Sequence, residues 1–328
     1  IGGKPVCPVC GLPGGVSKAL KEEDRAGIKE SANYLIEITR FTLKLFDDTV
    51  IKNKKYLDLI SGDIYKHTTY YMGLVDTKNK VNFYDGDVRV VDPDGKEFVK
   101  FKGRDYLNHI EEHIEPWSYM KFSFLKDIGW KGFVDGKKSG IFRVAPLARL
   151  NASDGMATPL AQEAYEKMYD LLGGKPVHNT LAFHWARLIE MLYGAECMLG
   201  LAEDPELTDP NVRNIPTATP DEGIGVVEAP RGTLIHHYKT DKKGILTDVN
   251  LIVATQNNAA AISMSVERAA KLLIHHGEVS DSLLNMVEMA FRAYDPCLAC
   301  ATHSLPGKMP LEIKIRNREG RVIKTLMR

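Results

Sequence analysis

The longest regular pattern in the sequence is that of one amphipathic helix, predicted from about Ser17 to Phe46. Its apolar residues recur three or four positions apart, the spacing that lines one face of a helix. The residues expected on that face are Ile28, Ala32, Leu35, Ile38 and Leu45. Gly27 lies inside the pattern and marks the place where a break is most expected, because glycine weakens a helix interior.

The second half of the chain predicts four further helices. They are expected near Thr158–Leu172, Thr180–Leu201, Ser263–His276 and Ser280–Tyr294. Ser280 and Asp281 are suited to cap the last of these helices and to fill its first turn. Together with the first long helix, these segments predict a helical core.

Runs of β-branched and aromatic residues predict three small sheets. The first combines residues 81–84, 88–91 and 98–101, with turns at Asp85-Gly86 and Pro93-Asp94-Gly95, and is expected to be peripheral. The other two are hairpins, formed by Gly232–Thr240 with Ile245–Thr255 and by Leu311–Arg316 with Arg321–Met327. The predicted fold is therefore mainly α, a helical-bundle core with small antiparallel β appendages, in one domain of residues 1–328.

The composition is that of a soluble globular protein without a bulk charge. Apolar residues make up 44% and charged residues 26%, and Lys+Arg and Asp+Glu both count 43. This balance argues against nucleic acid or an acidic membrane as a partner. No apolar run approaches the roughly 20 residues that span a bilayer, and the first residues lack the layout of a signal peptide. A cytoplasmic protein is expected.

The cysteines favour metal or redox chemistry over structural bridges. They are Cys7, Cys10, Cys197, Cys297 and Cys300. Four of the five form two C-x-x-C pairs, and a chain without an export signal meets a reducing compartment. The pairs are therefore expected to be thiols with a chemical role.

The most informative stretch runs from Asp295 to His303 and reads D-P-C-L-A-C-A-T-H. Pro296 should end the preceding helix, because it lacks an N–H and disfavours the right-handed helical conformation at the residue before it. The spacing of Cys297 and Cys300 lets both sulfurs reach one metal centre. Thiolates are soft ligands that suit nickel, low-valent iron or zinc.

Two other interpretations of the cysteine pairs stay open at this point. A redox dithiol usually opens a helix, whereas this pair is expected to follow one. A zinc site could use Cys7, Cys10, Cys297 and Cys300, although the two pairs lie nearly the whole chain apart and not at zinc-ribbon spacing.

The D-P-C-x-x-C-x-x-H stretch resembles the C-terminal signature of nickel–iron hydrogenase large subunits. Three segments upstream are similar to that family in the same order. They are residues 2–15, a G-G-x-x-x-C-P loop followed by P-G-G, residues 145–151, A-P-L-A-R-L-N, and residues 228–236, E-A-P-R-G-T-L followed by His236. The resemblance spans the whole chain and implies the large-subunit fold, in the cytoplasmic branch of the family.

The resemblance implies a nickel–iron centre whose iron carries CO and cyanide. Cys297 would be a terminal nickel ligand, and Cys300 would bridge nickel and iron. His303 would bind a nearby magnesium or other divalent ion. Such a hard cation normally takes oxygen ligands, so an imidazole there depends on the rest of its ligand shell.

The resemblance also implies a catalytic set and a reaction. Arg231 would stand over the open metal position, with Asp295 and Pro230 behind it as supporting residues. The reaction would be reversible oxidation of H₂, with a base that takes a proton. Because the chain has too few cysteines for iron–sulfur clusters, an iron–sulfur small subunit is implied, with electron-acceptor subunits beyond it. The acceptor, whether a nicotinamide, a deazaflavin, ferredoxin or a heterodisulfide reductase, stays open.

The sequence departs from the family in three places. The R-x-C-G-x-C motif that supplies the other two metal thiolates is absent, and we interpret this as truncation. Cys7 stands where the family usually has His. The residues after His303, Ser304–Arg328, match an extension that a maturation protease removes, so the chain resembles an unprocessed precursor. A non-catalytic relative, retained as a scaffold, is the alternative from another functional class.

Overall fold

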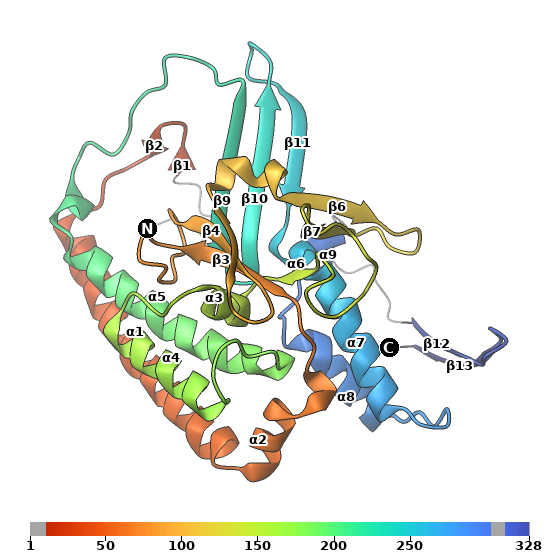
Figure 1. Cartoon of the computed structure of the whole chain (residues 1–328). Coiled ribbons are helices and arrows are strands. Elements are labelled where there is room, and N and C mark those ends of the chain that lie inside the picture. Colours follow the sequence, from red (N-terminus) through yellow and green to blue (C-terminus); the bar gives the residue numbers. More distant parts are fainter. Residues whose placement is uncertain (1–10, 303–311, 328) are drawn as a thin grey trace.

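The computed structural model describes residues 11–302 and 312–327 (Figure 1). Helices α1 (Glu22–Phe46), α4 (Pro159–Leu171) and α5 (Phe183–Glu203) run side by side along one flank. Helices α7 (Ala259–Leu273) and α8 (Asp281–Arg292) form the opposite flank. The shorter helices are α2 (Lys54–Ser61), α3 (Pro146–Ala152), α6 (Ala254–Asn257) and α9 (Leu298–Thr302).

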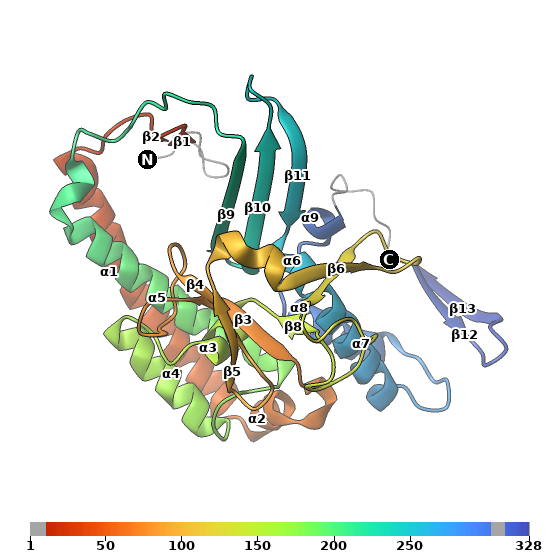
Figure 2. The same ribbon diagram turned by 45° about the horizontal axis from the view of Figure 1, so that its top comes forward.

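Two sheets connect the flanks (Figure 2). The four-stranded sheet has the order β5-β4-β3-β8, from Glu97–Phe101, Asp87–Val91, Tyr70–Val75 and Phe142–Arg143. The three-stranded sheet has the order β11-β10-β9, from Leu246–Ile252, Gly232–Thr240 and Glu222–Ala229. The two-stranded pairs are β1 (Gly11–Leu12) with β2 (Gly15–Val16), β6 (Ile110–Ile114) with β7 (Lys121–Leu125), and β12 (Glu312–Arg316) with β13 (Val322–Met327).

The mainly helical class with small sheets is confirmed, but the first predicted sheet differs in composition and position. Residues 82–85 form a turn, in which the Asn82 side chain accepts hydrogen bonds from the backbone N–H groups of Tyr84 and Asp85. Their place in the sheet is taken by β3, which is buried along its whole length and pairs in parallel with β8. The sheet is therefore part of the core and not a peripheral module.

The predicted helices are present, with shifted ends. Helix α1 starts at Glu22, continues through Gly27 without a break, and runs into a π-helical turn, Asp47–Ile51. Helix α7 starts earlier than expected and ends at Leu273. The Ser280 hydroxyl caps α8 as predicted, because it accepts the Leu283 N–H at 3.2 Å.

The buried face of α1 agrees with the predicted one at Ala32, which is buried, and at Ile28, which is half-buried, but not at the other three positions. Ala32 and Thr39 are buried, and Ile36, Leu43 and Phe46 pack against the core on the same face. Leu35, Ile38 and Leu45 are instead exposed, beside Tyr34 and Phe41. The helix carries two apolar stripes and α5 covers one of them, which a single-face interpretation of the pattern could not separate.

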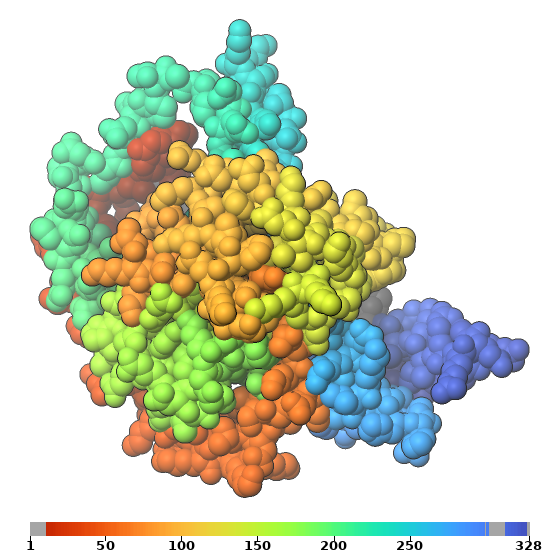
Figure 3. Space-filling model, in the orientation of Figure 1, coloured from red at the N-terminus to blue at the C-terminus, as the bar shows by residue number. Residues whose placement is uncertain are grey.

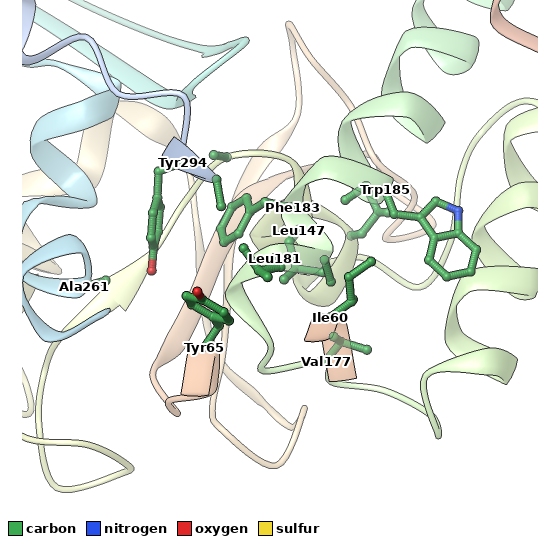
Figure 4. Packing of buried hydrophobic residues seen from close by; sticks show 14 of the residues in the cluster. Ile60, Tyr65, Leu147, Val177, Leu181, Phe183, Trp185, Ala261 and Tyr294 are labelled. Carbon is green, nitrogen blue, oxygen red and sulfur yellow. The ribbon is translucent and has the colours of Figure 1, made fainter. Parts of the chain in front are cut away.

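The main core lies where α3, α5, α7 and α8 meet (Figure 4). Phe183, at the start of α5, is fully buried, and its ring centroid lies 4.8 Å from that of Tyr294. Tyr65 closes the same cluster, and its hydroxyl donates to the Met286 carbonyl at 2.8 Å. This packing fixes the chain that follows α8.

Within the described residues, no helix is both long and apolar enough to cross a membrane.

Replacing Phe183 by Ala should lower the free energy of unfolding by about 3–5 kcal/mol, because it leaves a cavity in a core that cannot collapse. Phe41→Ala is the matched control, since that ring is 63% exposed, and it should change stability by less than about 0.5 kcal/mol. Denaturant unfolding of both variants measures this. Equal losses would contradict the packing described.

Candidate metal centre

A tightly held loop follows α8 and carries the cysteine pair. Helix α8 ends at Arg292, and Asp295 has a φ of +53°, in the left-handed region that its short polar side chain tolerates. As expected, the residue before Pro296 is not right-handed helical. However, α9 begins at Leu298, directly after Cys297, so the pair opens a short helix as well as following a long one. The pair thus follows α8 as expected, but because it also lies at the start of α9, its position no longer counts against a redox dithiol.

The two cysteine sulfurs lie together. Cys297 and Cys300 form a disulfide, with their Cα atoms 5.3 Å apart. Cys297 is half-buried and Cys300 is exposed, so the pair faces outward. When reduced, two thiols this close can act as ligands to one soft metal ion. Within the described residues, no group of three or more His, Cys, Asp or Glu side chains is placed to hold a metal.

Arg231 and Asp295 meet although 64 residues separate them. Arg231 stands on the turn between β9 and β10, and its Nε donates to the Asp295 backbone carbonyl at 2.5 Å. The same Nε lies 3.3 Å from the Asp295 carboxylate, and Nη2 lies 3.4 Å from it. The structure thus brings Arg231 to the residue that stands two positions before Cys297. Both side chains are about half exposed, at 41% and 47%.

Gly232 explains why the Arg231 turn sits where it does. Its φ is +127°, and a Cβ at this position would lie 2.2 Å from a methyl carbon of Val144. No other residue type fits both the backbone conformation and the space. Pro230, on the other side of Arg231, restricts the turn further.

The polar side chains of helix α6 and of Asn258, which follows it, hydrogen-bond to the neighbouring segments of the site. Thr255 accepts the Cys297 N–H at 3.1 Å, Asn257 donates to the Thr233 carbonyl at 2.9 Å, and Asn258 accepts the Val144 N–H at 2.9 Å. Gln256 donates to Glu112. All four residues of the Thr255–Asn258 segment are buried. The segment therefore joins the cysteine loop, β10 and the end of β8.

A buried polar cluster anchors Tyr294, next to Asp295. The His67 Nε2 lies 2.7 Å from the Ser265 hydroxyl and 3.2 Å from the Tyr294 hydroxyl, and the two hydroxyls are 3.0 Å apart. Burial lowers the pKa of His67 to about 4, and the neighbouring Arg143 adds to the effect, although Asp135 opposes it. His67 is therefore neutral at pH 7, and Tyr294 cannot turn away without breaking this cluster.

The sequence did not single out a second buried network. Arg149 of α3 is buried with Glu190 of α5 and Glu228 of β9, at N–O distances of 2.5–2.7 Å. Burial lowers the pKa of Arg149, but the two carboxylates outweigh it and the net shift is upward. Burial raises the pKa of Glu228, against the effect of Arg149. Charged residues inside otherwise apolar runs were the signal, since such residues are seldom buried unless paired.

Three of the predicted or considered ligands lie outside the described residues. They are Cys7, Cys10 and His303.

Comparison with known proteins identifies the family. The model of the nickel-dependent hydrogenases matches residues 14–303. The chain belongs to the nickel-dependent hydrogenase family.

The relatives are components of hydrogenases. The chain is 50% identical over 327 residues to an iron-sulfur subunit of the F420-non-reducing hydrogenase of Archaeoglobus profundus, covering 99% of this chain and 67% of that protein. It is 39% identical to the NAD-reducing hydrogenase HoxS subunit beta of Cupriavidus necator, covering 98% of this chain and 65% of that protein. The solved structure of an NAD⁺-reducing [NiFe]-hydrogenase in the H₂-reduced state superposes with a TM-score of 0.81 and 34% identity, over 90% of this chain and 63% of that one.

The resemblance carried by the motifs is therefore confirmed. This hydrogenase-family chain spans about two thirds of the length of the relatives it matches.

The shifted pKa of His67 predicts a pH dependence of stability. Between pH 6.5, the usual pKa of an unfolded histidine, and about 4, the unfolded chain binds a proton that the folded chain does not. Stability should therefore fall as the pH is lowered through this window, by up to about 3 kcal/mol from this residue. His178 should contribute to the same loss of stability at low pH, because burial lowers its pKa to about 4 as well.

Unfolding measured from pH 7 to pH 4 tests this. His67→Gln should flatten the pH dependence, whereas His275→Gln, at a more exposed position, should leave it unchanged. An unchanged slope in the His67 variant would show that this imidazole is not held in its neutral form.

Proposed function

We propose that the full-length protein is the catalytic subunit of a nickel–iron hydrogenase that oxidises H₂ reversibly. The observation that carries the proposal is the contact of Arg231 with Asp295, which places a guanidinium beside the loop of Cys297 and Cys300. Family membership supports the nickel–iron centre. Cys297 and Cys300 would hold half of it, and its iron would carry CO and cyanide.

Each residue around the pair has a role in this proposal. A bound nickel–iron pair would supply Lewis-acid polarisation of H₂. Arg231 provides a permanent positive charge at the mouth of the site, Asp295 orients it through its carbonyl and carboxylate, and Pro230 stiffens the turn. His303 would bind magnesium or another divalent ion near the C-terminus.

The proposal includes partners and maturation. An iron–sulfur small subunit would take the electrons and pass them to electron-acceptor subunits, in the cytoplasm. We further propose that residues 1–328 form one large-subunit domain and that a maturation protease removes residues 304–328. The β12–β13 hairpin of this tail projects from the body of the molecule (Figure 3), as a removable extension would.

A redox dithiol is the second candidate, because Cys297 and Cys300 are joined as a disulfide at the start of a helix. Cys297 directly precedes α9, and Cys300 lies in its first turn. A zinc site with Cys7 and Cys10 is the third. The metal content of the reduced protein separates these candidates. A redox dithiol needs no metal, and a four-cysteine site would hold zinc alone.

We expect nickel and iron, in equal amounts, in the full-length protein co-expressed with its small subunit. Cys297→Ser and Cys300→Ser should each abolish nickel binding, since serine lacks the soft thiolate. Cys197→Ser is the matched control and should keep the metals, because Cys197 lies apart on α5. Elemental analysis measures this, and stoichiometric zinc without nickel would refute the proposal.

Arg231→Lys should lower H₂-dependent dye reduction by about 10²-fold, because a point charge replaces a planar group placed for the reaction. Asp295→Asn should cost less, since its backbone carbonyl still accepts from Arg231. Metal content should be unchanged in both variants. Full activity of Arg231→Lys would exclude a catalytic guanidinium.

A further inference from the structure

Arg149 uses all of its hydrogen-bonding capacity at one place in the core. Its Nε and Nη2 donate to the two carboxylate oxygens of Glu190, and its Nη1 donates to Glu228 at 2.7 Å. The two remaining N–H groups point at the turn that carries Arg231. Nη1 donates to the Ala229 carbonyl at 2.9 Å, and Nη2 lies 3.4 Å from the Pro230 carbonyl. A guanidinium has five N–H donors, and here each has a partner.

Glu228 closes the same network from the strand. One of its oxygens accepts the Leu74 N–H and the Thr233 hydroxyl, both at 2.9 Å, while the other accepts from Arg149. Thr233 pairs with Glu228 across the hairpin, on the far side of the turn. Arg149 and Glu228 therefore fasten both arms of the turn from which Arg231 projects.

The network lies too deep to touch a substrate. The side chains of Arg149 and Glu228 are 1% and 0% exposed, against 41% for Arg231. Breaking such a buried pair is costly, so its geometry is rigid. Close packing adds to this, since a Cβ on Gly73 would lie 2.8 Å from the Arg149 side chain.

We propose that Arg149, held between Glu190 and Glu228, is the positioning residue that sets where the Arg231 guanidinium stands relative to Asp295. This inference rests on the proposed function for its effect on turnover. Its structural part, the fixing of the Ala229–Pro230 carbonyls, stands without it. Lysine cannot replace Arg149, because it offers three donors on one atom instead of a planar fork.

The chain offers a matched control. Arg89 is also buried between two carboxylates, Glu97 and Asp154, and donates to a backbone carbonyl, that of Ala152. Its partners do not include the Arg231 turn. Arg89→Lys therefore makes the same substitution at a buried arginine away from the site, although the carboxylates of Glu97 and Asp154 are 44% and 54% exposed.

The test is a double-mutant cycle in the full-length holoenzyme with its small subunit. Arg149→Lys should lower H₂ turnover by about tenfold in the wild-type background and less than about twofold in Arg231→Lys, because residues that act as a unit are not additive. Arg89→Lys should have the same small effect in both backgrounds. Glu190→Gln, a milder change, should show a smaller loss with the same dependence on Arg231, and serves if Arg149→Lys does not fold.

Amide hydrogen exchange gives a readout independent of turnover. Exchange in the segment of residues 226–234 should be faster in Arg149→Lys than in the wild type, and unchanged in Arg89→Lys. Equal effects of the two lysine variants, or multiplicative losses with Arg231→Lys, would overturn the positioning role. A wild-type complex without nickel or H₂ activity would instead refute the proposed function and leave the exchange result to decide the inference.

Discussion

One buried guanidinium shared by two buried carboxylates holds the helical flank to the hairpin sheet. Arg149 comes from α3, Glu190 from α5 and Glu228 from β9, and none of the three is appreciably exposed. Moving a charged side chain from water into the core costs several kcal/mol of free energy. The attraction between the oppositely charged partners offsets most of this cost. Helices α3 and α5 and strand β9 therefore cannot move apart without leaving a buried charge unpaired. Such a network adds little net stability but disfavours other arrangements of these elements, since they would leave a buried charge unpaired.

The candidate site is assembled from segments that are remote in sequence and fixed by different means. The Arg231 turn is fixed by hydrogen bonds from Arg149 and by the lack of space at Gly232. The cysteine loop is fixed by Thr255 and by the buried anchor of Tyr294. Buried contacts fix each segment independently. The contact between Arg231 and Asp295 is therefore a result of this packing and not its cause.

The sequence predicted features with local causes and missed those set by tertiary contacts. Strand β10 and the Ser280 cap were predicted because β-branched runs and capping hydroxyls act over a few residues. Strand β3 was missed because it is buried on both faces and shows no alternation. The motif identified Arg231, Asp295 and the cysteine pair as one set. It offered no reason to assign a role to Glu190, whose importance depends on a residue 41 positions away.

The contrast in burial between the site and its support has a physical consequence. Arg231 and Asp295 lie at a surface, where water screens their attraction and an ion pair contributes under about 1 kcal/mol. The groups beneath them are buried and already ordered, so the binding proposed for the cysteine pair would need little further ordering of the backbone. If more protein covers this face, the same pair gains strength because the local dielectric falls. The described residues thus form a rigid support beneath the contact of Arg231 with Asp295, and the strength of that contact depends on what is packed over it.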